Sequence, residues 1–162
     1  MAIANMDIVI RERIIIKTMN NQWNSNNNMK KIYSKIEPNI LLHLVYRLDE
    51  MDGRTNISPD EEFLQLASIK MIKGQTFKAH KHIHLEKTTT IAQESWIVVK
   101  GSVKCIFYDL DDTIIAEPVL YPGDCSMTFR GGHNYLIMED DTLVYEYKTG
   151  PYLGQKLDKE FL

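Results

Sequence analysis

Three histidines at alternating positions are the residues of this chain best suited to chemistry. His80, His82 and His84 stand two positions apart, and Glu94 follows further along the chain. Alternate side chains of a β-strand lie on one face of its sheet, so a strand over this stretch would direct all three imidazoles to the same side. Imidazole nitrogens and a carboxylate oxygen together can bind a divalent metal ion. The spacing therefore predicts a metal site built on β-strands.

Which carboxylate joins the histidines at the metal site depends on where the strand reverses direction. If the chain turns back near Thr88, antiparallel pairing places His82 opposite Glu94. Glu86 has the same parity as the histidines but would lie near the tip of that hairpin, so we favour Glu94 and keep Glu86 as the alternative. Histidines on a strand that faces solvent would instead be an ordinary polar face, and the alternation alone is compatible with both interpretations.

The elements that must position these residues are predicted to be β-strands. From Ile40 onward, short apolar runs rich in Val, Ile, Tyr and Phe are separated by Gly, Asp and Pro, a pattern typical of an all-β sandwich or barrel. Only residues 59–66 favour a short helix, with Ser58 as its N-cap. Strand parity directs a mostly apolar set towards the interior beside the histidines: Lys78, Trp96, Val98, Val103, Cys105, Phe107 and Tyr135.

Length and composition limit the class of protein. The chain has 162 residues, 44% of them hydrophobic, which suits one domain with a real core. The net charge of -3 without a basic stripe argues against a nucleic-acid partner. No apolar run approaches the ~18 residues of a membrane span. Cys105 and Cys125 are too few for a disulfide framework, which favours a reduced, cytoplasmic setting.

The chain divides into an extension and a domain. Residues 20–28 form an Asn-rich polar tract that cannot bury enough surface to offset the entropy of ordering it. We therefore expect a flexible N-terminal extension over residues 1–28 and one compact domain over residues 29–162. An open strand near the start of that domain would be covered by pairing with a second copy, which predicts a homodimer.

Two stretches of the chain resemble the conserved motifs of the cupin superfamily. Gly74, His80 and His82, followed by Glu94 and Gly101, resemble the first motif, and residues 122–133 resemble the second. The resemblance implies a small antiparallel β-barrel of the jelly-roll type in which four side chains hold one divalent metal ion, which could be Fe, Mn, Ni, Cu or Zn. Carried over to this sequence, the four are His80, His82, Glu94 and His133, with His84 and Glu86 as alternates.

The stretch over residues 146–152, followed by Asp158 and Lys159, resembles the tail of small cupins of surface-polysaccharide and nucleotide-sugar pathways. The resemblance implies a metal-dependent enzyme that acts on a small oxygenated molecule, such as a sugar or nucleotide sugar, by isomerisation or epimerisation. Two alternatives stay open. One is an Fe(II)-dependent dioxygenase on the same barrel, and the other is a non-catalytic sensor that binds a small ligand through the metal.

Further polar residues are candidates for a role near the site. Tyr135 lies two residues after His133 and therefore on its face, where it could act as an acid or base or else fill the core. Arg130 precedes residues 131–132 at an expected rim, where a guanidinium could bind a carboxylate or phosphate or else remain solvated. His43 is expected to be a strand histidine satisfied by its neighbours.

Overall fold

The computed structural model describes residues 28–48 and 53–162, and these residues form an all-β fold with one short helix. The expectation of an all-β chain is confirmed. The N-terminal extension predicted over residues 1–28 lies outside the described residues except for Asn28. The strands are β1 (Met29–Tyr33), β2 (Leu41–Tyr46), β3 (Arg54–Asn56), β4 (Ala67–Ile69), β5 (Glu94–Lys100), β6 (Val103–Tyr108), β7 (Ile114–Ala116), β8 (Val119–Leu120), β9 (Cys125–Thr128), β10 (His133–Ile137) and β11 (Leu143–Lys148), and the helix is α2 (Gln155–Asp158).

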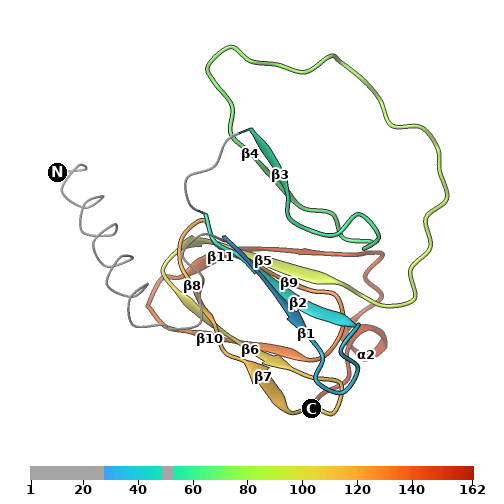
Figure 1. Cartoon of the computed structure of the whole chain (residues 1–162), viewed down its shortest axis with the longest axis vertical. Helices are drawn as coiled ribbons and strands as arrows, with labels where there is room; N and C mark the ends of the chain where they lie inside the picture. The colour runs from blue at the N-terminus through green and yellow to red at the C-terminus, as the bar shows by residue number, and fades with distance from the viewer. Residues whose placement is uncertain (1–27, 49–52) are drawn as a thin grey trace.

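Two antiparallel sheets face each other (Figure 1). The larger sheet has the strand order β1-β2-β9-β5-β11. The smaller has the order β10-β6-β7, and β8 also pairs with β6. Strands β3 and β4 form a separate hairpin. Within the described residues neither large sheet closes on itself, so the observed arrangement is an open pair of sheets.

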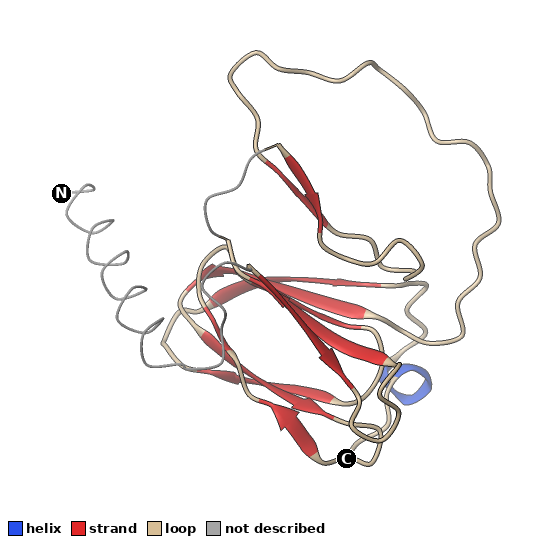
Figure 2. Cartoon of the chain, in the orientation of Figure 1, coloured by secondary structure: helices blue, strands red, loops and turns tan. Residues whose placement is uncertain are grey.

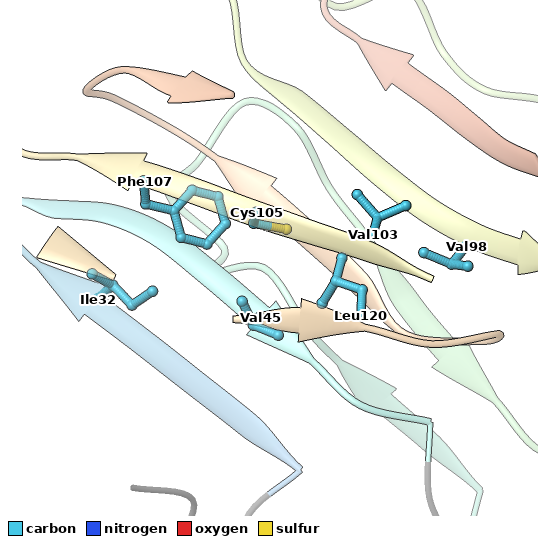
Figure 3. Close-up of a cluster of buried hydrophobic side chains, with 7 residues drawn as sticks. All are labelled: Ile32, Val45, Val98, Val103, Cys105, Phe107 and Leu120. Atoms are coloured by element: carbon cyan, nitrogen blue, oxygen red, sulfur yellow. The ribbon is translucent and has the colours of Figure 1, made fainter. Parts of the chain in front are cut away.

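The core lies between these two sheets (Figure 3). Strand β6 shows the expected alternation, because Val103, Cys105 and Phe107 are fully buried while the residues between them are only partly so. The prediction from strand parity is thus confirmed for the residues of β5, β6 and β10, but Lys78 lies exposed outside both sheets. The buried cluster consists of Ile32, Val45, Val98, Val103, Cys105, Phe107 and Leu120, with Trp96 and Tyr135 packed against it.

Strand β2 is buried on both faces, which explains its unbroken apolar sequence. Val45 points into the core between the sheets, whereas Leu44 belongs to a second cluster on the outer face of the larger sheet. Residues 57–66 cover that outer face with Ile57, Leu64 and Leu66. Among the described residues, none of β11 belongs to this second cluster, and Tyr145 and Tyr147 of that strand remain more than half exposed.

The short helix predicted over residues 59–66 is absent from the structure, and a turn takes its place. The hydroxyl of Ser58 does not cap a helix but accepts a hydrogen bond of 2.7 Å from the backbone N–H of Leu66. The N–H of Leu64 donates to the side-chain oxygen of Gln93, also at 2.7 Å. These two backbone N–H groups already have side-chain partners, so a helix would give them no additional hydrogen bonds.

The strand predicted through the alternating histidines is also absent. Residues 70–93 contain no strand and sweep outward from β4 to β5 (Figure 2). The expected pairing of His82 with Glu94 does not occur, because Glu94 pairs with Thr128 on one side and Lys148 on the other. Both backbone edges of β5 are therefore occupied. No helix among the described residues is long and apolar enough to cross a membrane.

Candidate functional site

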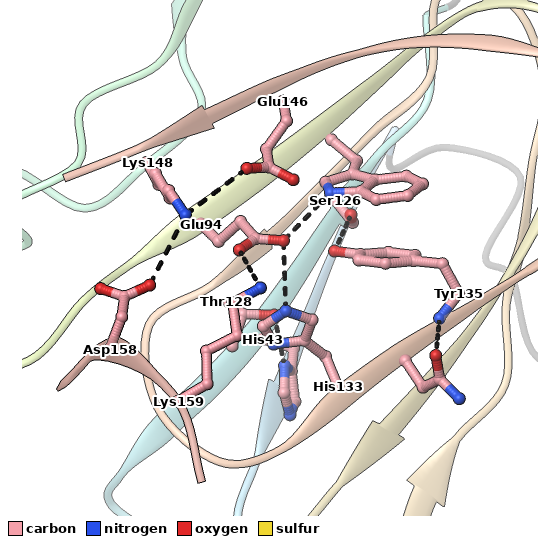
Figure 4. Close-up of polar contacts among 12 residues, drawn as sticks. His43, Glu94, Ser126, Thr128, His133, Tyr135, Glu146, Lys148, Asp158 and Lys159 are labelled. Carbon is pink, nitrogen blue, oxygen red and sulfur yellow. Dashed lines mark hydrogen bonds and ion pairs between the residues drawn. The ribbon is translucent and has the colours of Figure 1, made fainter. Parts of the chain in front are cut away.

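Glu94 and His133 meet where the two sheets face each other (Figure 4). Glu94 opens β5 of the larger sheet and His133 opens β10 of the smaller one. Nε2 of His133 lies 3.2 Å from Oε1 of Glu94. The carboxylate side chain is 8% exposed and the imidazole 22%, so both groups are mostly sheltered from solvent, the histidine less completely. The structure thus brings together two of the four residues nominated for the metal.

The carboxylate of Glu94 is held by three neighbours. Besides its contact with His133, Oε1 accepts a hydrogen bond of 3.0 Å from the indole Nε1–H of Trp96, and Oε2 lies 3.7 Å from Nζ of Lys159. Burial alone would raise the pKa of Glu94, but the hydrogen bond to His133 and the charges of His133 and Lys159 outweigh it and hold that pKa below its ordinary value. The group therefore stays ionised at neutral pH.

An aromatic pair forms the wall beside the dyad of Glu94 and His133. The rings of Trp96 and Tyr135 stack with centroids 3.9 Å apart and planes 13° from parallel, and the Tyr135 ring lies 5.4 Å from that of His133. The Tyr135 hydroxyl lies 3.2 Å from Oγ of Ser126. Burial raises the pKa of Tyr135, so the phenol stays protonated at neutral pH. It can donate a hydrogen bond there but is a poor base.

His43 lies on β2 behind the dyad and is fully buried. Its Nε2 lies 3.0 Å from the carbonyl oxygen of Tyr108, so Nε2 carries the proton and donates it, while Nδ1 accepts from the hydroxyl of Thr128 at 3.1 Å. Burial lowers the pKa of His43 to about 4, which keeps the ring neutral. The expectation that its neighbours satisfy His43 is confirmed.

Arg130 has a specific partner in the structure. Its guanidinium NH1 lies 2.7 Å from Oε1 of Glu62, whose other carboxylate oxygen accepts a 2.7 Å hydrogen bond from Nε2 of Gln93. Glu62 is almost fully buried, and Gln93 directly precedes Glu94. Arg130 thereby fixes the chain at the start of β5, and its guanidinium is engaged with a carboxylate of the protein itself.

The segment after β11 supplies residues that the sequence analysis did not place in the site. Lys159 reaches Glu94 as described above, and Nζ of Lys148 lies 3.5 Å from Oδ2 of Asp158 and 3.9 Å from the centroid of the Tyr152 ring. The tail resemblance includes Lys159 but does not place it beside Glu94, because this contact depends on the path of the chain after β11 and not on a strand period.

The remaining predicted ligands are not at the dyad. His80, His82, His84 and Glu86 are all exposed within residues 70–93. The His80 and His82 rings have centroids 5.5 Å apart, and Nδ1 of His80 lies 3.0 Å from the carbonyl oxygen of Lys78. Within residues 28–48 and 53–162, no group of three or more His, Cys, Asp or Glu side chains is arranged to hold a metal ion. As placed, these residues do not fit the four-ligand set that the cupin resemblance implies.

We compared the chain with protein-family models, with curated proteins and with solved structures, and found no significant match in any of the three.

Proposed function

We propose that the protein is an enzyme that moves a proton within a small oxygenated molecule, such as a sugar or a nucleotide sugar, in an isomerisation or epimerisation. The observation that carries this proposal is the 3.2 Å contact between His133 and the sheltered carboxylate of Glu94. A histidine oriented by a carboxylate is a common arrangement for general acid and base catalysis.

The geometry of the dyad assigns a role to each imidazole nitrogen. The ionised carboxylate of Glu94 can only accept, so Nε2 of His133 carries a proton and donates it to Oε1. Nδ1 is then the basic nitrogen, and within the described residues it has no hydrogen-bond partner. It would take a proton from a hydroxyl-bearing carbon next to a carbonyl, leaving an enediolate. Returning that proton to the former carbonyl carbon, while the hydroxyl proton passes to the former carbonyl oxygen, isomerises the substrate. Returning a proton to the other face of the first carbon epimerises it.

The aromatic wall supports a ligand with an apolar face and several polar groups. Trp96 and Tyr135 lie beside the dyad, and their neighbours supply few polar atoms, of which the hydroxyl of Ser126 is one. Such a lining, mostly aromatic with a small number of placed polar groups, is typical of small-molecule sites. A sugar ring has this character, because its C–H face packs on an aromatic ring while its hydroxyls bind carboxylate and imidazole groups.

The divalent metal that the resemblance implies stays a prediction, and no step above passes through it. We also infer that the two sheets are the halves of a jelly roll, which is supported by their antiparallel strands and shared core. The homodimer is likewise a proposal. It rests on the expectation that an open strand near the start of the domain is covered by pairing with a second copy.

Deuterium exchange tests the proposed reaction without knowledge of the product. The protein is incubated in D₂O with a panel of keto and aldehyde sugars and nucleotide sugars, and NMR follows deuterium at the carbon next to the carbonyl. We expect exchange with the wild type, a loss of ~100-fold or more in His133→Gln, and a large loss in Glu94→Gln. His82→Gln is the matched histidine control and should keep full activity.

Other outcomes identify the competing functions. Oxygen consumption with the same panel would contradict the proposal and favour a dioxygenase, whereas binding without exchange would favour a sensor. Elemental analysis of the purified protein accompanies each assay. If His82→Gln loses both bound metal and activity, the four-ligand metal site replaces the dyad as the explanation.

A further inference from the structure

The segment after β11 crosses the end of the sandwich where the dyad lies (Figure 4). Lys159 extends its ammonium group to within 3.7 Å of Oε2 of Glu94. The adjacent Asp158 places Oδ2 3.5 Å from Nζ of Lys148, which closes the last turn of the segment onto β11. The larger sheet is therefore contacted at two neighbouring points, on the strand of Glu94 and on the strand beside it.

The same segment also contacts the smaller sheet next to the histidine. A Cβ atom added to Gly132 would lie 2.6 Å from Cδ1 of Leu162, so Leu162 rests directly against the residue before His133. A side chain at position 132 would displace Leu162 from this place. Residues 149–162 consequently touch the protein on both sides of the dyad, one side through charges and the other through an apolar contact.

This segment is held weakly compared with the sheets. Helix α2 buries none of its residues, and Leu153, Leu157 and Phe161 are each exposed by 70% or more. Ion pairs between partly exposed side chains contribute little to stability, commonly ~0–1 kcal/mol each. Segments with few buried apolar contacts open at a lower free-energy cost than the core does. Residues 150–162 can therefore leave the dyad without unfolding the sandwich, while Thr149 stays hydrogen-bonded to Gln93 beside β5.

We propose that residues 150–162 form a strap that closes over Glu94 and His133 and must open for a ligand to reach them. The Lys159 ammonium group occupies the position at Oε2 of Glu94 that a hydroxyl group of the ligand would take once the strap is open. This inference rests on the proposed function only in treating that ligand as a substrate, because the strap itself follows from the contacts of Lys159, Asp158 and Leu162.

Chemical modification of His133 measures the opening of the strap directly. Diethyl pyrocarbonate modifies accessible imidazoles, and mass spectrometry of peptides gives the rate for each histidine. We expect Lys159→Gln to raise the rate at His133 by about fivefold, the factor that corresponds to ~1 kcal/mol of lost ion pairing. Lys156→Gln, in helix α2 of the same segment, should leave the rate unchanged. The fully buried His43 reports the integrity of the fold in every variant.

A second variant tests the other contact of the strap. Gly132→Ala should displace Leu162 and also raise the rate at His133, while Lys159→Arg should keep it near the wild-type value. An unchanged rate in both Lys159→Gln and Gly132→Ala overturns the strap, as does an equal rise in Lys156→Gln. These rates are independent of catalysis, so a failure of deuterium exchange would refute the proposed reaction and leave the strap standing.

Discussion

Histidines occur in two regions of this protein, one built of paired β-strands and the other without regular secondary structure. His133 sits in β10, paired through the backbone with Phe107 of β6, and its ring contacts a carboxylate of the opposite sheet. His80, His82 and His84 lie in a stretch without strand structure and are all exposed. Alternation gives a segment two faces but does not make it a strand, because a strand also needs a neighbour for its backbone hydrogen bonds.

The apolar residues of the two regions repeat the same contrast. Phe107 is fully buried and stacks on His43 with ring centroids 4.3 Å apart, whereas Phe77 and Ile83 are 60% and 85% exposed. Burial of apolar area stabilises the first region, and the second gains almost nothing from its apolar side chains. The predictions below test whether this contrast holds in solution.

The largest difference is expected between two phenylalanines. Phe107→Ala should lower the free energy of unfolding by ~3–5 kcal/mol, because it leaves a cavity in the core. Phe77→Ala should change it by less than ~0.5 kcal/mol. Urea denaturation measures both. An equal loss in Phe77→Ala would show that the exposed segment packs against the protein or a second copy in solution.

Between pH 4 and 6.5, the stability of the protein should depend on pH through His43. The pKa of His43 is about 4 in the folded protein against 6.5 for the free side chain, so the unfolded state binds more protons between these values. Stability is complete above pH 6.5 and falls as the pH drops towards 4, by on the order of 3 kcal/mol. Denaturation at several pH values should show this slope in the wild type and a much flatter one in His43→Gln.

A smaller effect is expected at the ion pair of Arg130. Arg130→Met leaves the nearly buried Glu62 without its cation, and we expect a loss of ~1–2 kcal/mol, since the arginine is partly exposed. Lys81→Met, in the exposed segment, should change the stability by less than ~0.5 kcal/mol. If Arg130→Met leaves stability unaltered but weakens binding of an anionic ligand, Arg130 binds that ligand, which is the role that the sequence analysis expected for it.

The smallest effect is expected at the alternating histidines themselves. His82→Ala should change the free energy of unfolding by less than ~0.5 kcal/mol, because the ring is exposed. Thermal unfolding with and without added Zn²⁺ or Mn²⁺ provides the sharper measurement. A rise in melting temperature on adding metal that disappears in both His82→Ala and His133→Ala would show that the two regions join around one ion.

Local patterns in the sequence predicted much of the sandwich. The alternation in β6 and the parity of Val98 and Tyr135 identified the inner face correctly, because period two is enforced wherever one face is buried. The contact between Glu94 and His133 joins two residues that the resemblance to cupins nominated as metal ligands, and their role as ligands stays a prediction. The inner face was predictable because the burial of each strand is encoded in its own few residues.

The sequence predictions that failed depended on contacts between distant segments, which no single segment encodes. Residues 70–93 have a strand pattern, but both edges of β5 are taken by β9 and β11, which leaves no place for the hairpin predicted there. The helix predicted after Ser58 does not form, because the backbone N–H groups of Leu64 and Leu66 donate to the side chains of Gln93 and Ser58 instead. The contact of Lys159 with Glu94 depends on the path of the whole chain. Each of these outcomes is decided by competition between distant segments.

Both cysteines of the chain are shielded in the interior. Cys105 and Cys125 are buried, and burial raises the pKa of each thiol to about 12. Since the thiolate is the reactive form, the folded protein should behave towards maleimides as though it had no cysteine. A single cysteine introduced on the strap or among the alternating histidines could then be labelled specifically with a spectroscopic probe. The rate at which Cys105 and Cys125 react with a maleimide would report the rate of global unfolding.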